Sequence, residues 1–346
     1  ATSQSLLNYS SITLPDSLKK DADAVYHLEE NVIDIQSPSK MTIRSHSIVT
    51  VLTKAGLHHS VVRIGVDKQR KLEEITIKVY NELGIEVSRF KKKDFKLEGA
   101  YDGVTLATDD KLYELDFPVP GTPCTIETEY ELNMTGFIDI PSWYFGSTTE
   151  SFKKSRFVVK SAIPVKYKTY NFNDKPLVTT EDKKTVYTWE LANKPVPKTE
   201  TASYGSKVSL PIVDVSPSQF SYDGYPGSLE TWKEFGKWYS DEILAGTTEL
   251  PEETKAKIKA LVGDEKDIVK KAKIVYQYVQ SKSRYVSIQV GIGGWKPMLA
   301  SDVDRVGYGD CKALTNYTKA LLNVVGVPSY NTLLYRNPTK TNIESD

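Results

Sequence analysis

The spacing of hydrophobic residues changes near residue 216, and this change most strongly limits the folds available to the chain. Between residues 24 and 213, short segments rich in Val, Ile, Tyr, Thr and Phe often alternate with polar residues, which indicates many short strands. Turn-forming residues follow from Pro217 to Gly227, and beyond them the hydrophobic residues recur at helical spacing. We therefore predict a β-rich, sandwich-like domain over residues 1–215, a linker over 216–227 and a second domain over 228–346.

Individual elements can be predicted within each domain. In the first domain the predicted strands are 25–35, 41–52, 60–66, 72–81, 85–90, 111–117, 125–132, 156–163, 165–172, 185–191 and 206–213. In the second domain we predict helices over 229–244, capped by Ser228, over 252–262, over 265–281, capped by Asp264, and over 313–325. A strand is predicted over 327–336, where Tyr, Leu and Thr are frequent.

The last of these helices begins next to a cysteine, in the sequence Gly307-Tyr-Gly-Asp-Cys-Lys312. Asp310 is a good N-cap residue, and Gly326 stands where a glycine commonly ends a helix. A stripe at helical spacing is formed by Leu314, Tyr317, Thr318, Leu321, Leu322 and Val325. Because Cys311 precedes Leu314 by three residues, we expect its side chain to lie on this buried stripe.

Cys311 is the candidate nucleophile of the chain. The N-terminus of a helix carries partial positive charge and unpaired N–H groups, which stabilise a thiolate and so lower the pKa of a thiol at that position. The alternative interpretation of Cys311 is a buried structural thiol. The other cysteine, Cys124, follows Pro123 at the start of a strand, and we expect it to serve core packing.

A cysteine nucleophile usually needs a histidine as its base, and no histidine follows Cys311. The four histidines are His27, His46, His58 and His59, all in the β-rich domain, where we expect surface or interface positions. Adjacent residues of a strand point to opposite faces, so His58 and His59 should diverge. None of the four recurs at metal-ligand spacing, so we predict no metal site, and no cofactor signature is present.

Two residues near the glycine-rich loop are further candidates for the site. The Gln289 amide lies upstream of Cys311 and is suited to an oxyanion hole together with the Cys311 backbone N–H; the alternative is an outward-facing strand glutamine. Trp295 is interpreted as a wall of a substrate-binding cleft, the alternative being that it covers the loop. The loop Gly291-Ile-Gly-Gly294 lacks the Lys-Ser/Thr ending of a phosphate-binding loop and is interpreted as a turn.

Composition excludes several classes of protein. Of the 346 residues, 45 are Lys or Arg and 45 are Asp or Glu, and this formal net charge of zero argues against a nucleic acid partner. No apolar run approaches the roughly 18 residues of a membrane-spanning helix. Two cysteines cannot form a disulfide framework in a chain of this length. We therefore expect a globular protein without a membrane span.

Several segments of the second domain resemble a known family. Residues 285–297, the sequence Gly307-Tyr-Gly-Asp-Cys-Lys312 and residues 320–328 resemble the nucleophile half of a transglutaminase-like, or papain-like, cysteine protease domain. The preceding region, in particular residues 23–27 and 46–56, resembles the uncharacterised β-rich domain that often stands before it in bacterial envelope proteins. The resemblance implies an α+β fold for residues 228–346.

The resemblance also implies an activity and a location. Cys311 would be the nucleophile of a Cys-His-Asp triad that forms a thioester with a peptide or protein substrate, without a cofactor, in the periplasm or cell envelope. The family's histidine and aspartate follow the cysteine helix and would lie beyond residue 346, so we expect a C-terminally truncated fragment with little or no activity. Ala313 stands where the family often has Asp.

Two functions are therefore open at this point. The first is a transglutaminase-like cysteine protease or amidase, in which the β-rich domain positions a substrate or partner. The second is a non-catalytic β-sandwich module that binds a glycan or a protein and is attached to a degenerate transglutaminase-like fold. A histidine and an aspartate in a continuing reading frame would favour the first function.

Overall fold

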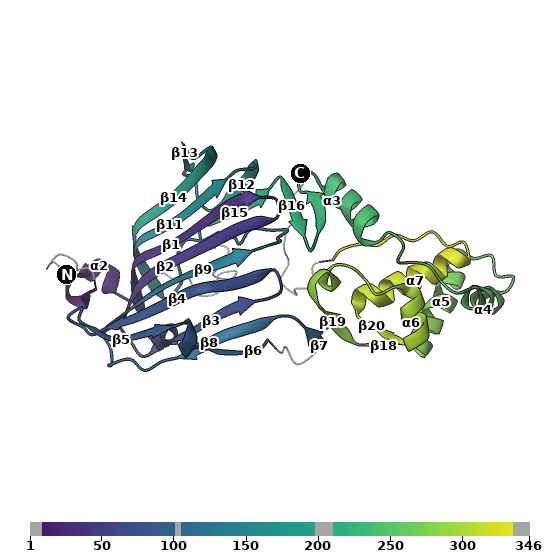
Figure 1. Cartoon of the computed structure of the whole chain (residues 1–346), viewed down its shortest axis with the longest axis horizontal. Helices are drawn as coiled ribbons and strands as arrows, with labels where there is room; N and C mark the ends of the chain where they lie inside the picture. Colours follow the sequence, from purple (N-terminus) through teal and green to yellow (C-terminus); the bar gives the residue numbers. More distant parts are fainter. Residues whose placement is uncertain (1–8, 101–104, 198–209, 335–346) are drawn as a thin grey trace. The chain divides into compact units, whose positions relative to one another are not determined.

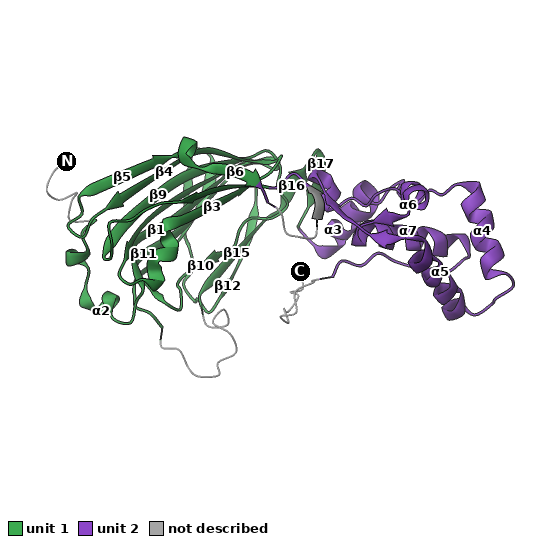
Figure 2. Cartoon of the chain, turned by 90° about the horizontal axis from the view of Figure 1, so that it is seen from below, with its two compact units in different colours: residues 1–98, 111–229 green, residues 99–110, 230–346 purple. Residues whose placement is uncertain are grey.

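The computed structural model describes residues 9–100, 105–197 and 210–334. These residues form two compact units, which Figure 2 distinguishes by colour. Unit 1 comprises residues 1–98 and 111–229, and unit 2 comprises residues 99–110 and 230–346. The short segment 99–110 therefore belongs with the C-terminal unit, although the sequence places it between predicted strands of the first domain.

Unit 1 is built almost entirely from strands. These strands are β1 (Ala24–Ser37), β2 (Lys40–Val51), β3 (Val61–Val66), β4 (Arg70–Tyr80), β5 (Glu86–Lys91), β6 (Lys96–Gly99), β8 (Lys111–Asp116), β9 (Cys124–Met134), β10 (Trp143–Tyr144), β11 (Glu150–Ser161), β12 (Val165–Tyr170), β13 (Leu177–Glu181), β14 (Lys184–Lys194), β15 (Ile212–Pro217), β16 (Gln219–Tyr222) and β17 (Tyr225–Ser228). Short helical turns accompany them at η1 (Ser11–Thr13), α2 (Asp16–Lys19), η2 (Ala55–Ser60) and η3 (Lys92–Asp94).

The largest sheet of unit 1 has eight strands in the order β13-β14-β11-β1-β2-β9-β4-β5 (Figure 1). Its pairings are antiparallel except between β1 and β11, which run parallel. Two three-stranded sheets, β10-β15-β12 and β3-β8-β6, and the hairpin β16-β17 complete the unit. The hairpin occupies most of the segment 216–227 that was predicted to be a linker.

One hydrophobic core joins the eight-stranded sheet to the two three-stranded sheets. It contains residues of the large sheet such as Ile33 and Ile77, together with Ile64 of β3 and Val213 of β15. Cys124 belongs to this core and is fully buried, as expected. Because the shared core lies between a large sheet and two smaller ones, unit 1 is sandwich-like.

Unit 2 packs helices around a second core. Its elements are β7 (Thr105–Thr108), α3 (Trp232–Trp238), the π-helical turn η5 (Tyr239–Ile243), α4 (Glu252–Val262), α5 (Ile268–Lys282), β18 (Arg284–Tyr285), β19 (Ser287–Gln289), η6 (Gly291–Gly294), α6 (Ala300–Val306), β20 (Tyr308–Gly309) and α7 (Cys311–Val324). The short strands pair in parallel, β18 with β20 and β19 with β7. The core is formed chiefly by α4, α5, α6 and α7.

Predictions for unit 2 differ from the structure at several points. Helix α3 begins at Trp232 and is capped by Thr231, which accepts the N–H of Glu234 at 3.2 Å, a role predicted for Ser228. Helix α5 begins at Ile268 because the Asp267 carboxylate accepts the N–H of Lys270 at 2.9 Å and so caps the helix, a role predicted for Asp264. Helix α6 was not predicted. The segment 327–334 pairs with no strand among the described residues, so the predicted strand is wrong there, and residues 335–336 lie outside the described part.

In the described part of the chain, no helix has both the length and the apolar character that crossing a membrane would require.

Candidate functional site around Cys311

The N-terminus of α7 is fixed by Asp310, as its sequence predicted. The Asp310 carboxylate accepts the N–H of Ala313 at 2.9 Å, and the Asp310 carbonyl accepts that of Leu314 at 2.9 Å. The same carboxylate forms an ion pair with Lys312, and Asp310 itself is only 5% exposed. Among the described residues no partner occupies the N–H groups of Cys311 and Lys312, so two donors remain at this helix end.

The C-terminus of α7 is closed by a glycine motif. Gly326 has a positive φ of 72°, which a residue without Cβ adopts readily. Its N–H donates to the carbonyl of Asn323 at 3.1 Å, and the N–H of Val327 donates to that of Leu322 at 3.0 Å. These two bonds form a Schellman motif, which confirms the predicted end of the helix.

A largely buried carboxylate, whose side chain is 11% exposed, ties α7 to its neighbouring helices. Asp304 of α6 accepts hydrogen bonds from the Tyr317 hydroxyl and the Thr254 hydroxyl, both at 2.6 Å, and it pairs with Lys282. Burial alone would raise the pKa of Asp304, but hydrogen bonds from Lys282, Thr254 and Tyr317 outweigh it and lower that pKa. Helices α4, α5, α6 and α7 therefore meet at one charged, fully engaged side chain.

A second polar contact anchors the middle of α7. The Asn316 side chain is fully buried and donates to the Thr247 carbonyl at 2.8 Å. The Thr247 hydroxyl donates to the Leu244 carbonyl at 2.6 Å and lies 3.2 Å from the Asn316 amide oxygen. The Thr247 carbonyl also accepts the N–H of Ala300, the first residue of α6, at 2.8 Å. Asn316 is thus a buried structural residue.

The expectation that Cys311 lies on the buried stripe of α7 is wrong, because Cys311 is exposed. The buried face of the helix runs through Ala313, Tyr317, Ala320 and Leu321. Residues advance by about 100° around a helix, so Cys311, two positions before Ala313, points away from this face. The small residues Ala313 and Ala320 allow close packing, and this shifts the buried face away from Leu314 and Leu322.

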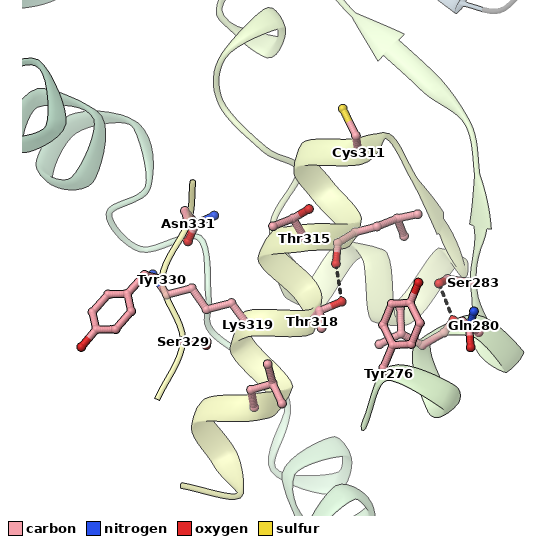
Figure 3. A pocket seen from close by; sticks show the side chains of 13 residues that line it. Tyr276, Gln280, Ser283, Cys311, Thr315, Thr318, Lys319, Ser329, Tyr330 and Asn331 are labelled. Atoms are coloured by element: carbon pink, nitrogen blue, oxygen red, sulfur yellow. Dashed lines mark hydrogen bonds between the residues drawn. The ribbon is translucent and has the colours of Figure 1, made fainter. Parts of the chain in front are cut away.

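An open groove of about 640 Å³ follows the face of α7 that carries Cys311. Its walls come from α7, from α5 and from the segment after α7, and include Cys311, Thr315, Thr318, Leu322, Tyr276, Gln280 and Tyr330. Figure 3 shows Cys311 at the end of the groove, with its sulfur directed away from the other lining side chains. The thiol therefore stands at the rim of the groove, open to approach by another molecule.

The surroundings of Cys311 include a tyrosine that the sequence did not single out. Burial, followed by the charges of Asp310 and Cys311, raises the pKa of Tyr239 on the π-helical turn η5. The phenol of Tyr239 therefore lies in the neighbourhood of both residues, and it stays protonated at neutral pH. No sequence signal marked this residue, because the turn brings it to α7 from about seventy positions away.

Gln289 is the last residue of strand β19, and Trp295 directly follows the turn η6. The Trp295 ring packs edge-on against Phe235 and Trp238, with ring centroids 6.0 and 6.2 Å apart. Gln289 is exposed and donates to the Ser287 hydroxyl at 3.4 Å. Among the described residues, neither side chain lines the groove beside Cys311, so their roles in substrate binding and in an oxyanion hole stay predictions.

The other cysteine, Cys124, is enclosed in the core of unit 1. Burial raises the pKa of Cys124 to about 11, so this thiol is protonated at neutral pH.

All four histidines belong to unit 1, and unit 2, which contains Cys311, has no histidine in its sequence.

The prediction that His58 and His59 diverge is wrong. They lie in the helical turn η2 rather than in a strand, and both Nε2 atoms face one oxygen of Glu150.

Comparisons with known proteins relate the chain to known folds. Residues 37–198 match the family model of a domain of unknown function with a solved structure, DUF3857. The crystal structure of a putative protease from Parabacteroides distasonis superimposes with a TM-score of 0.63 at 16% identity, covering 88% of this chain and 59% of that chain. At this identity the likeness shows a shared fold, and our chain spans 59% of the length of that neighbour.

Two other solved structures match more weakly. An M1 zinc metallopeptidase from Deinococcus radiodurans has a TM-score of 0.27 and 11% identity, with 70% of this chain and 53% of that chain covered. Aminopeptidase A from Legionella pneumophila has a TM-score of 0.27 and 10% identity, with 70% and 27% covered. These TM-scores are too low to support an argument. No curated protein is significantly similar to the chain.

Proposed function

We propose that this chain carries the nucleophile of a transglutaminase-like cysteine protease or amidase, and that Cys311 is that nucleophile. The observation that supports this most directly is the position of the Cys311 thiol, which is exposed at the N-terminus of a rigidly capped helix and at the rim of a groove. The dipole of a helix favours negative charge at this end. A thiol in this position is chemically available, which a buried structural cysteine is not.

In the proposed reaction the Cys311 thiolate attacks the carbonyl carbon of a peptide amide. The C–N bond then breaks, the leaving amine takes up a proton, and the acyl group remains on Sγ as a thioester. Water or an amine attacks this thioester, which releases an acid or a new amide and restores the thiolate. Developing negative charge on the carbonyl oxygen would be stabilised by the N–H groups of Cys311 and Lys312.

Two further observations support this function. The fold is shared with a protein described as a putative protease. The sequence around Cys311 resembles the nucleophile half of the transglutaminase-like family, and this resemblance also leads us to propose a location in the periplasm or cell envelope. The proposed reaction needs a base, and unit 2 contains no histidine. We therefore expect the first acylation to be observable and later turnover to be slow.

Acylation can be tested with a peptide p-nitrophenyl ester, whose activated leaving group departs without a general acid. We expect a rapid release of about one nitrophenolate per chain, in keeping with a single covalent nucleophile. The matched variants are Cys311→Ser, which should lose this burst, and Cys124→Ser, which should retain it. A burst of equal size in Cys311→Ser would contradict the proposal.

The groove can be tested separately. Thr315 is exposed on the groove wall one helical turn from Cys311, so Thr315→Arg should hinder a peptide ester more than the small ester p-nitrophenyl acetate. The nearby exposed Asn323→Arg, which is not part of the groove lining, provides a charge-matched control. Equal slowing of both esters by Thr315→Arg would show that the groove does not receive the substrate.

A non-catalytic function is the second candidate, and it is suggested by the groove beside Cys311, in which no described lining residue is a histidine. In that case unit 1 would bind a glycan or a protein, and unit 2 would be a degenerate relative of the enzyme fold. The absence of any burst, together with binding of the intact chain to an immobilised glycan or peptide, would select this function.

A further inference from the structure

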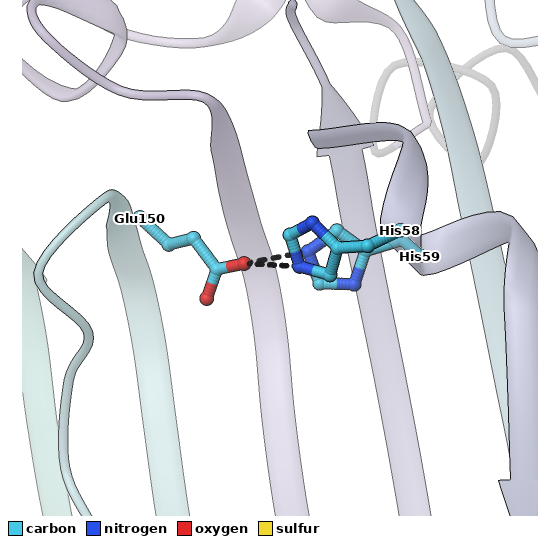
Figure 4. A group of neighbouring side chains, drawn as sticks. All are labelled: His58, His59 and Glu150. Carbon is cyan, nitrogen blue, oxygen red and sulfur yellow. Dashed lines mark hydrogen bonds and ion pairs between the residues drawn. The ribbon is translucent and has the colours of Figure 1, made fainter. Parts of the chain in front are cut away.

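Three side chains of unit 1 converge at a point remote in sequence from Cys311. The Nε2 atoms of His58 and His59 lie 3.2 and 2.7 Å from the same carboxylate oxygen, Oε1 of Glu150 (Figure 4). The histidines belong to the turn η2 and the glutamate begins β11, so residues about ninety positions apart meet here. All three potential ligand atoms lie within 4.8 Å of one another.

The hydrogen bonds of His58 determine which of its ring nitrogens carries the proton. Nδ1 lies 2.9 Å from the backbone carbonyl oxygen of Ala55, and a carbonyl only accepts, so Nδ1 donates. In the neutral ring Nε2 then presents a lone pair, and this lone pair faces the oxygen of Glu150. Such an arrangement is repulsive unless the ring is protonated or a cation lies between the two atoms. Donation from the second ring nitrogen to a carbonyl is also the usual support of a metal-binding histidine.

The backbone that presents the two histidines is held in place. Gly56 packs so closely on β1 that a Cβ there would lie 2.6 Å from the carbonyl oxygen of Asp23. That carbonyl accepts the N–H groups of Leu52 and Thr53, and the Thr53 hydroxyl donates to the Asp23 carboxylate at 2.6 Å. The His59 ring is oriented by an edge-on contact with Tyr26, at 5.6 Å between ring centroids. The turn therefore does not depend on a ligand for its position.

Exposure divides the three groups in a way that suits a ligand entering from solvent. The side chains of His59 and Glu150 are 13% and 10% exposed, whereas that of His58 is 60% exposed. The cluster of one carboxylate and two imidazoles is therefore open to solvent only on the side of His58.

We propose that His58, His59 and Glu150 form a binding site for a divalent transition-metal cation, with Zn²⁺ as the reference ion. Imidazole nitrogen and carboxylate oxygen are ligands that Zn²⁺ accepts at about 2.0–2.2 Å, which places tetrahedral ligands about 3.3 Å apart. The distance of 3.2 Å from His58 to Glu150 already matches this separation, while that of 2.7 Å from His59 has to lengthen by about half an ångström. Three protein ligands leave the fourth position of the metal to water or another small donor.

A similar cluster on another part of the sheet lacks these properties. His46 faces Glu127 at 2.9 Å and Glu129 at 3.3 Å, but Glu127 also accepts from Lys78, Tyr80 and Tyr9 at 2.9, 2.8 and 3.1 Å. Four donors already engage that carboxylate, one of them an ammonium group that would repel a metal ion. His46 is therefore a suitable internal control for the site at Glu150.

The proposal can be tested on the whole chain carrying Cys311→Ser, since an exposed thiol would itself bind Zn²⁺. Isothermal titration with Zn²⁺, and titration with Co²⁺ followed by its visible ligand-field absorption, measure affinity and coordination without reference to any activity. We expect one ion per chain. His58→Ala should weaken binding at least tenfold, because it removes one of three ligands, and Glu150→Gln should do the same. His46→Ala should leave binding unchanged.

His58→Ala is the decisive variant, because its exposed side chain can be removed without disturbing the core, whereas Glu150→Gln alters a buried group. Circular dichroism should show that both variants remain folded. No binding to the parent protein, or binding that His58→Ala leaves unchanged, would overturn the proposal and leave the cluster as an ion pair. Since the test is made without Cys311, its failure would not bear on the proposed nucleophile.

Discussion

The two cysteines of this chain occupy opposite kinds of environment, although each stands at the first residue of an element. Cys124 begins β9 in unit 1 and is fully buried in the core of the sandwich. Cys311 begins α7 in unit 2 and is exposed at the rim of a groove. Burial raises the pKa of the first thiol to about 11, while the second faces solvent at the end of a helix that favours anions. The comparison shows that position in the fold, rather than residue type, decides whether a thiol can act.

The scaffolds around the two thiols resemble each other in one respect. Each unit contains a carboxylate that several donors satisfy: Glu127, which is buried in unit 1, and Asp304 of unit 2, whose side chain is 11% exposed. Such groups stabilise a fold only while their partners remain, because an unpaired buried charge is costly. Each of these two carboxylates stabilises the unit that holds one of the thiols, and each can be altered separately.

The largest effect is expected in a direct comparison of thiol reactivity. Iodoacetamide should modify Cys311 at least about 1000-fold faster than Cys124 in the native protein, because Cys124 becomes accessible only when unit 1 opens. Peptide mapping by mass spectrometry at successive times gives both rates. Unfolding in urea should abolish the difference between the modification rates of the two cysteines. Comparable rates in the absence of urea would contradict the burial assigned to Cys124.

Removal of the buried carboxylate in unit 2 tests whether the scaffold of α7 is needed. Asp304→Ala leaves Lys282 without its partner and should lower the free energy of opening of α7 by about 3 kcal/mol, as measured by hydrogen exchange of α7 peptides. Asp302→Ala on the same helix removes only an exposed pair with Arg305 and should change it by less than about 0.5 kcal/mol. Equal effects would show that the network at Asp304 is dispensable.

Acid should weaken unit 1 through Glu127. Burial would raise the pKa of Glu127, but hydrogen bonds from His46, Lys78 and Tyr80 lower it to about 2, below its ordinary value of 4.5. A carboxyl with a depressed folded pKa contributes stability above the unfolded pKa, and this contribution is lost as pH falls from about 4.5 to 2.

The expected loss of unfolding free energy attributable to Glu127 is about 3 kcal/mol. Little of it is screened by solvent, because the Glu127 side chain is only 4% exposed. Hydrogen exchange of β9 peptides across this pH range, corrected for intrinsic exchange, measures it. Glu127→Gln should be less stable at neutral pH and should lack this part of the acid dependence. An unchanged slope in Glu127→Gln would mean that other groups cause the acid loss.

The smallest effect concerns the cap of α7. Asp310→Ala removes the acceptor for the Ala313 N–H and should reduce the stability of the first turn by about 1 kcal/mol, whereas Asp310→Asn keeps a capping oxygen and should cost less. Hydrogen exchange at the start of α7 distinguishes the two variants. If Asp310→Ala and Asp310→Asn were equally stable, the capping bond would not be what fixes the position of Cys311.

The features that the sequence predicted well are those encoded by neighbouring residues. Both ends of α7 follow from Asp310 and Gly326, and the strands around β9 follow from alternation of polar and apolar residues. On the buried face of α7, Tyr317, Leu321 and Val325 are buried as predicted. Ala313 and Ala320 are buried as well, whereas Leu314 and Leu322, which the spacing favoured, are only partly buried. Packing against other helices decides that face, and local spacing does not record it.

The cluster at Glu150 could not have been predicted from local sequence. Its glutamate lies about ninety residues from the two histidines, and a strand at 58–59 would have separated their rings. The turn η2 forms instead because Gly56 packs against the Asp23 carbonyl, a contact between distant segments. The same holds for Tyr239, whose phenol lies in the neighbourhood of Asp310 and Cys311 although it stands about seventy positions before them in the sequence.

The most direct test of the central claim is the location of the acyl group after one brief exposure to a peptide ester. The chain would be quenched in acid, digested, and mapped by mass spectrometry with and without neutral hydroxylamine, which cleaves thioesters. Our account predicts one acyl group on the peptide that contains Cys311, removed by hydroxylamine and absent from Cys311→Ser. Acyl groups spread over surface lysines, resistant to hydroxylamine and unchanged in Cys311→Ser, would contradict it.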